Sequence, residues 1–261
     1  MALLHIGTYA GSGGRGLVPV SLGDRTNPAP PEDVKLDLVR VFRISPLGCI
    51  GCIAVGLTNS AFRTLSPVYA AEIGMSVTDV VTFVSVGIIG GAIVQYPLGA
   101  LSDRWDRRAV LLLSSAGAMA TALAIAFGAG NVPLTNFVLV FVFGSFAMPL
   151  YSLSAAHAND RAGKGEFVLV NAALMLFYSV GAVGGPFAAS LTMQQFGPAA
   201  LFVFMAAVYL ILIVIILYRM RARDSVPAER RGRFVALLRT STVFARLARK
   251  PGGKSNPPRQ G

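Results

Sequence analysis

Apolar residues dominate six long stretches of this chain, and short polar connections separate them. A helix that spans the hydrocarbon core of a bilayer needs about 20 mostly apolar residues. Six stretches reach this length: residues 45–70, 77–101, 108–128, 133–156, 166–191 and 197–218. The pattern therefore predicts an all-α membrane protein with six transmembrane helices.

Polar segments flank the predicted helices on both sides. Residues 1–43 are rich in Gly, Pro and charge, a composition too polar to bury a core, so we expect a flexible leader there. Residues 220–261 form a basic tail. The sequence thus predicts a six-helix bundle over 44–219 between a leader and a tail.

The basic residues indicate how the bundle is oriented. Of the 23 lysines and arginines, all except Arg63 fall in the leader, the connections after the second and fourth helices, or the tail. Positive residues accumulate on the cytoplasmic side of membrane proteins. We therefore expect a multi-pass membrane protein with both termini in the cytoplasm.

Composition agrees with a membrane protein. Hydrophobic residues make up 54% of the chain, charged residues 13%, and the mean hydropathy is +0.63. The net charge of +11 could suggest nucleic acid, but no basic motif is interleaved with aromatic residues, so we expect no nucleic-acid partner. Cys49 and Cys52 form a Cys-x-x-Cys without a second ligand pair, so we expect packing residues and neither metal nor cofactor.

The first helix carries small or polar residues at alternating spacings of three and four. They are Ser45, Cys49, Cys52, Gly56, Asn59, Arg63 and Ser66. Such a seam faces either neighbouring helices or a watery cavity. Arg63 favours the cavity, because an ionised group in hydrocarbon costs several kcal/mol unless it is hydrated or paired. The alternative is that Arg63 snorkels toward the outer headgroups.

Isolated polar side chains on apolar helices are the candidates for contact with a solute. They are Asn59, Arg63, Gln95, Asn171 and Tyr178. Each also has a packing explanation, and His157 is expected to be a residue at a helix end. No acidic residue falls near the middle of a predicted helix, so a buried carboxylate for proton coupling is not evident.

Small residues predict where helices approach closely. The second helix places Gly87, Gly91, Gln95 and Gly99 on one stripe. The fifth helix has Gly181 and Gly185 at the same spacing, and small residues at this spacing let two backbones approach.

One short loop, Gly99-Ala100-Leu101-Ser102-Asp103-Arg104-Trp105-Asp106-Arg107-Arg108, connects the second and third helices. Asp103 lies where the second helix ends, so its carboxylate can accept backbone N–H bonds or pair with a nearby arginine. Such a cluster can hold one arrangement of helices and release another. The alternative is a charged loop that only fixes orientation.

This loop and the six-helix topology resemble one half of a major facilitator superfamily transporter. The resemblance is carried by Gly99, Leu101, Ser102, Asp103, Arg104, Arg107 and Arg108, with Asp106 where the family often has a second glycine. Arg43-Ile44-Ser45-Pro46-Leu47-Gly48 resembles the exit from the family's central cytoplasmic loop, which favours the C-terminal half. Pro149-Leu150-Tyr151 and Ala156-His157-Ala158-Asn159-Asp160-Arg161 resemble a bacterial YcaD-like branch.

The resemblance implies an architecture and an activity. Its helices would form two inverted three-helix repeats, residues 45–128 and 133–218, an arrangement known for this superfamily. It implies transport of a small solute by alternating access, with a gating motif of Gly99, Asp103, Arg104, Arg107 and Arg108. A single bundle would need a second six-helix half or a copy of itself, so we expect a half-length or truncated form in the lipid bilayer.

Two other classes of protein are considered. A non-transporting membrane scaffold could act through Phe234-Val235-Ala236-Leu237-Leu238 and the arginines around it. An intramembrane hydrolase would need Ser145 and His157 as nucleophile and base, but their separation along one helix is about 18 Å. We therefore expect no enzyme.

Overall fold

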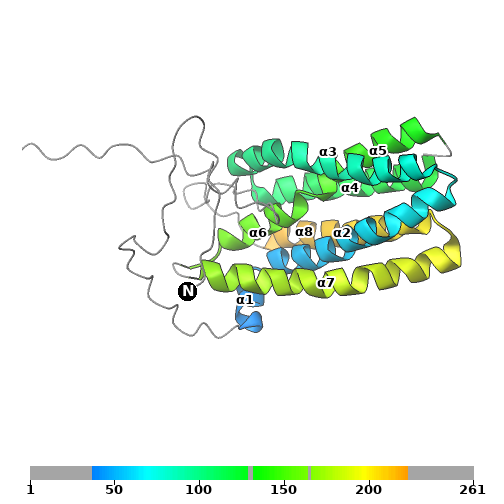
Figure 1. The fold of residues 1–261 in the computed structure, drawn as a ribbon. Helices are drawn as coiled ribbons and strands as arrows, with labels where there is room; N and C mark the ends of the chain where they lie inside the picture. Colours follow the sequence, from blue (N-terminus) through cyan, green and yellow to red (C-terminus); the bar gives the residue numbers. More distant parts are fainter. Residues whose placement is uncertain (1–36, 129–131, 164–165, 223–261) are drawn as a thin grey trace, which may run out of the picture. The chain divides into compact units, whose positions relative to one another are not determined.

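The computed structural model describes residues 37–128, 132–163 and 166–222, and in these ranges the chain is helical with no strand. Figure 1 shows the long helices running side by side, with the short α1 set across the beginning of α2. The helices are α1 (Leu38–Ile44), α2 (Pro46–Glu72), α3 (Val77–Arg104), α4 (Arg107–Gly128), α5 (Pro133–Ala147), α6 (Leu150–Asn159), α7 (Phe167–Phe196) and α8 (Ala200–Ala222).

The fourth predicted helix is interrupted. The predicted helix over 133–156 is present as one membrane-crossing segment, Pro133–Asn159, but a turn at Met148 and Pro149 divides it into α5 and α6. Proline has no backbone N–H and its ring clashes with the preceding turn, which explains a break at this point. The combined segment Pro133–Asn159 is still long and apolar enough to cross a membrane.

The leader was predicted to be flexible up to residue 43, but the structure has helix α1 over its last residues. The Asp37 side chain accepts a hydrogen bond from the backbone N–H of Arg40 and so caps α1. Ser45 then caps α2 by accepting from the N–H of Gly48, and the chain bends by 109° between the two helices. The rest of the leader, residues 1–36, and the tail from residue 223 lie outside the described residues.

Five helical segments in the described ranges are long and apolar enough to span a membrane: α3, α4, α5 with α6, α7 and α8. Helix α2 meets the same criterion only together with α1, which would bring the number to six. The reason lies in its sequence, because Asn59, Ser60 and Arg63 interrupt its apolar residues. The chain is therefore a multi-pass membrane protein.

Helix contacts follow a two-fold pattern. The most extensive contacts join α2 to α7, α3 to α5, and α4 to α8. Let the first repeat be α2–α4 and the second α5–α8, so that α2 corresponds to α5 with α6, α3 to α7, and α4 to α8. Exchanging the two repeats then turns the α2–α7 contact into the α5–α3 contact and leaves the α4–α8 contact unchanged. This is the pattern that two inverted three-helix repeats produce.

Glycines allow both of the equivalent close approaches. A Cβ on Gly181 would collide with the carbonyl oxygen of Ile53 and lie 3.1 Å from the Cα of Gly56, and a Cβ on Gly144 would collide with the carbonyl oxygen of Gly87. Backbone therefore packs directly on backbone at α2–α7 and at α3–α5. Of the small-residue stripes read from the sequence, Gly87, Gly181 and Gly185 lie at these close contacts.

Helix α1 is held against the start of α7 by an ion pair between Arg40 and Glu166. The backbone N–H of Gly163 lowers the pKa of the Glu166 carboxyl, and Arg40 lowers it further. A carboxylate whose pKa is lower in the folded protein stabilises fully above its unfolded-state pKa and loses this effect as the pH falls through the folded-state value. We expect the ends of α1 and α7 to separate in acid.

Spin labels on the exposed residues Val39 and Val168 would measure this separation. Their distance distribution should broaden as the pH is lowered below the ordinary range for Glu. The Glu166→Gln variant should show the broad distribution at every pH. A distribution that stays narrow in Glu166→Gln at neutral pH would contradict this role for the ion pair.

Candidate functional site

A cavity of about 790 Å³ lies among α2, α3, α6 and α7. Its lining includes Met148 at the break between α5 and α6, so the interrupted helix borders the cavity. Several lining residues, such as Arg63, Ala92 and Ser179, are exposed, so the cavity opens to one side of the bundle. The polar side chains that line it are Asn59, Ser60, Arg63, Thr64, Gln95, Tyr151, Ser152, Tyr178 and Ser179.

Helix α2 supplies the charged part of this lining. The small and polar residues predicted along one side of α2 have two different environments. Asn59 and Arg63 line the cavity, whereas the others are buried among helices: Ser45, Cys49, Cys52, Gly56 and Ser66. The structure thus brings Arg63 to a polar cavity. Asn59 lies deeper in its wall and is only 8% exposed.

The opposite wall is built by polar contacts between helices. Gln95 on α3 donates a hydrogen bond from Nε2 to Oγ of Ser152 on α6, at 3.1 Å. Tyr151 and Tyr178 meet edge to face, with ring centroids 5.4 Å apart, and join α6 to α7. Tyr151 and Ser152 were not among the predicted site residues, although Tyr151 belongs to the Pro149-Leu150-Tyr151 motif read from the sequence.

Asn171 is not brought to this cavity. Its side chain exchanges hydrogen bonds with the Asn159 side chain, at 3.1 and 3.3 Å, and donates to the carbonyl of Phe167. Asn159 is the last residue of α6 and Asn171 lies in the second turn of α7. The pair therefore joins the ends of two helices, away from the four other predicted residues.

A charge cluster occupies the end of the bundle where α3 ends and α4 begins. The guanidinium of Arg107 contacts Asp103 at 3.5 Å and pairs with Asp160, which follows α6. It also donates to Oγ of Ser102 at 3.4 Å. Since the Arg107 and Asp160 side chains are only 3% and 6% exposed, this buried ion pair ties the first repeat to the second.

The other residues of the predicted motif take different positions. The Asp106 carboxylate accepts from the backbone N–H of Arg108 and pairs with its guanidinium at 3.0 Å, so Asp106 caps α4. Gly99 is buried within α3. Arg104 is exposed at the end of that helix, and no ion pair with it is found in the described ranges.

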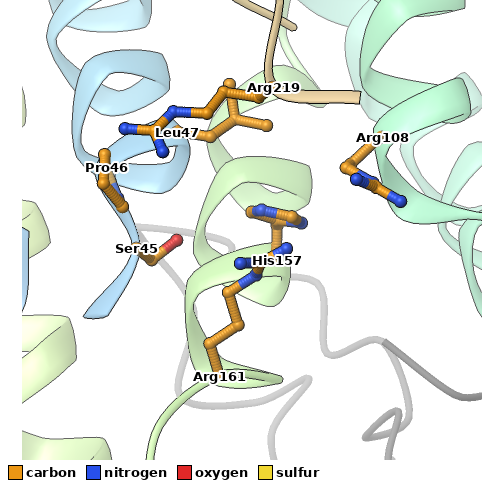
Figure 2. A pocket seen from close by; sticks show the side chains of 7 residues that line it. All are labelled: Ser45, Pro46, Leu47, Arg108, His157, Arg161 and Arg219. Carbon is orange, nitrogen blue, oxygen red and sulfur yellow. The ribbon is translucent and has the colours of Figure 1, made fainter. Parts of the chain in front are cut away.

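A second, much smaller pocket of about 10 Å³ lies beside this cluster. Figure 2 shows Arg161 extending toward the His157 imidazole, with Arg108 and Arg219 approaching from α4 and α8. His157 is only 5% exposed and lies in the last turn of α6, as expected of a residue at a helix end. The volume suffices for about one water molecule, so this pocket is part of the packing.

No group of metal-ligating side chains is found among the described residues. Cys49 and Cys52 are buried and free, and Cys49 Sγ lies 3.9 Å from the carbonyl oxygen of Val41.

An apolar helical bundle with a polar cavity between its helices, bounded by a broken helix, is the arrangement of a polytopic membrane transport protein. The family model of the Major Facilitator Superfamily matches residues 48–252, and the chain belongs to this family. The members of this superfamily are transporters.

Its relatives include an uncharacterised MFS-type transporter of Yersinia pestis (strain Pestoides F), 30% identical over 175 residues, or 67% of this chain and 44% of the relative. The uncharacterised MFS-type transporter YcaD of Salmonella paratyphi B is 29% identical over the same shares. The resemblance to the superfamily and to YcaD is thereby confirmed. The chain spans less than half the length of these relatives, and which half it corresponds to stays a prediction.

Proposed function

We propose that this chain moves a small solute across the bacterial inner membrane by alternating access, as one six-helix half of a transporter. The observation that carries the proposal is the cavity of about 790 Å³ at the α5–α6 break. Solute sites in transporters of this kind lie near the middle of the membrane between helical repeats. Asn59, Arg63, Gln95 and Tyr178 are the proposed contacts; Asn171 would act only through the helix ends.

The second half of the transporter would cover the open side of the cavity. Beside the cavity, α3 and α7 expose large apolar side chains, among them Ile89, Ile93, Val183 and Phe187. A second six-helix bundle would seal this surface, since alternating access requires two bundles that move against each other. We propose either a separately encoded half or a second copy of this chain as that partner.

The charge cluster is proposed to set the balance between access states. Arg107 joins the end of α3 to the end of α6, and both helices line the cavity. A change in this ion pair can therefore be transmitted to the cavity wall. The cluster and both termini are proposed to lie in the cytoplasm, which the basic connections support.

Cysteine labelling from the two sides of the membrane tests this function. Cys49 and Cys52 are replaced by Ala, and Ser179→Cys places one reactive thiol in the cavity. A membrane-impermeant maleimide should label this thiol both in spheroplasts and in inside-out vesicles. Labelling from one side only would contradict alternating access and favour a membrane scaffold.

The gating role has its own measurement in the same vesicles. Asp103→Asn and Arg107→Ala should each change the ratio of labelling from the two sides. Arg43→Gln, at an exposed arginine of α1 outside the predicted motif, is the control and should leave the ratio unchanged. If all three variants behave like the parent, the loop only fixes orientation.

A further inference from the structure

The cavity carries positive charge that no residue in its own lining balances. Arg63 is the charged residue of the lining, and neither Asp nor Glu is among the cavity residues. Within the described ranges no ion pair to Arg63 is found, although Arg40, Arg107 and Arg108 each have one. Arg63 is exposed toward the cavity, so its guanidinium is available to a solute.

The depth of Arg63 in the membrane strengthens this positive charge. Helix α2 ends at Glu72, nine residues beyond Arg63, which corresponds to about 14 Å along the helix axis. The hydrocarbon core is about 30 Å thick, so an α2 that ends at the membrane interface would hold Arg63 inside the core. A charge at such depth is screened less than a charge at the surface and is costly without a counter-charge.

The uncharged part of the lining suits the same class of solute. Asn59 and Gln95 each carry an amide NH2 group, although Gln95 already donates to Ser152, and a guanidinium presents a fork of donors that matches a carboxylate or phosphate. We infer that the solute of this cavity is a small organic anion, bound through its carboxylate or phosphate group by Arg63. This inference rests on the proposed transport function and names the class of substrate for the same site.

Two thiol reagents of similar size and opposite charge test the inference without knowledge of the solute. The thiol of Ser179→Cys, in the protein lacking Cys49 and Cys52, is reacted in native membranes with sulfonatoethyl and with trimethylammonioethyl methanethiosulfonate. The ratio of the two rates, relative to the ratio for a free thiol in solution, reports the potential in the cavity. We expect the anionic reagent to be favoured by about tenfold.

Variants of Arg63 identify the source of the potential. Arg63→Gln should bring the ratio to that of the free thiol, Arg63→Lys should keep it raised, and Arg63→Glu should reverse it. Arg43→Gln removes a positive charge on α1, outside the cavity lining, and should change nothing. A thiol at the exposed residue Gln194, on the same helix and outside the lining, should show no preference.

A ratio at Ser179→Cys equal to that of the free thiol would overturn the inference, because a partner carboxylate would then neutralise Arg63. A raised ratio that persists in Arg63→Gln would overturn it as well. Both results are independent of the two-sided labelling that tests transport. An anion-selective cavity that is labelled from one side only would support the inference and contradict alternating access.

Discussion

Replacing Gly181 with Ala should lower the free energy of unfolding of the bundle by about 1–3 kcal/mol or more, because the added Cβ would overlap backbone atoms of α2. It would collide with the carbonyl oxygen of Ile53 and lie 2.8 Å from the backbone nitrogen of Leu57. Both neighbours are backbone atoms of α2, so no side chain can rotate away. The free energy of unfolding in mixed detergent micelles would measure the loss.

Gly184→Ala is the matched control for this variant. It makes the same change in the same helix, but its Cβ would meet only the end of the Leu57 side chain, at 3.7 Å. We expect a change near zero, or a slight gain from the better helix propensity of Ala. Equal stability of the two variants would show that α2 and α7 do not pack as closely as the structure has them.

Removal of the Asp160 carboxylate by Asp160→Asn should cost about 3–5 kcal/mol, the range for breaking one partner out of a buried ion pair. Arg107 is almost completely buried and would keep its charge with one carboxylate fewer. The same unfolding measurement applies, and two-sided labelling of Ser179→Cys would report whether the access balance changes with it.

Asp103→Asn serves as the comparison for Asp160→Asn. It also removes a carboxylate from Arg107, but the Asp103 side chain is 32% exposed and the contact is longer, so we expect a loss below about 1 kcal/mol. The double variant Arg107→Leu with Asp160→Leu should recover much of the stability, since it removes both charges of the buried pair. A larger loss for Asp103→Asn than for Asp160→Asn would contradict this assignment.

Features that depend on position along one helix could be predicted from the sequence. The spacing of Asn59 and Arg63 placed them on one face of α2, and both line the cavity. The spacing of Gly181 and Gly185 indicated a close helix contact for the same reason. The bounds of the long helices agree with the apolar runs to within a few residues.

Features that depend on which helices meet could not be predicted in the same way. Asp160 was visible in the sequence as the end of a helix, but nothing local shows that it meets Arg107, 53 residues earlier. Asn171 looked like Asn59, a single polar residue on an apolar helix, yet it pairs with Asn159 because the end of α6 lies beside the start of α7.

The helix break shows a third kind of difficulty. Pro67, Pro97 and Pro186 lie inside the continuous helices α2, α3 and α7, whereas the chain turns at Pro149. A proline removes one backbone hydrogen bond wherever it occurs, and the surrounding contacts decide whether the helix continues. The sequence therefore indicates four prolines at which a helix could be interrupted, but it does not indicate that the interruption occurs at Pro149.

The low apolarity of α2 bears on how the protein enters its membrane. On its own, α2 is not apolar enough to rank with the five spanning segments. Its most extensive contact is with α7, the fifth helix after it in the chain. Its stable place in the bilayer therefore depends on a helix that is synthesised much later. Until α7 arrives, α2 must be sheltered by the insertion machinery or by other helices, so variants at Gly181 should impair membrane insertion as well as the stability of the finished bundle.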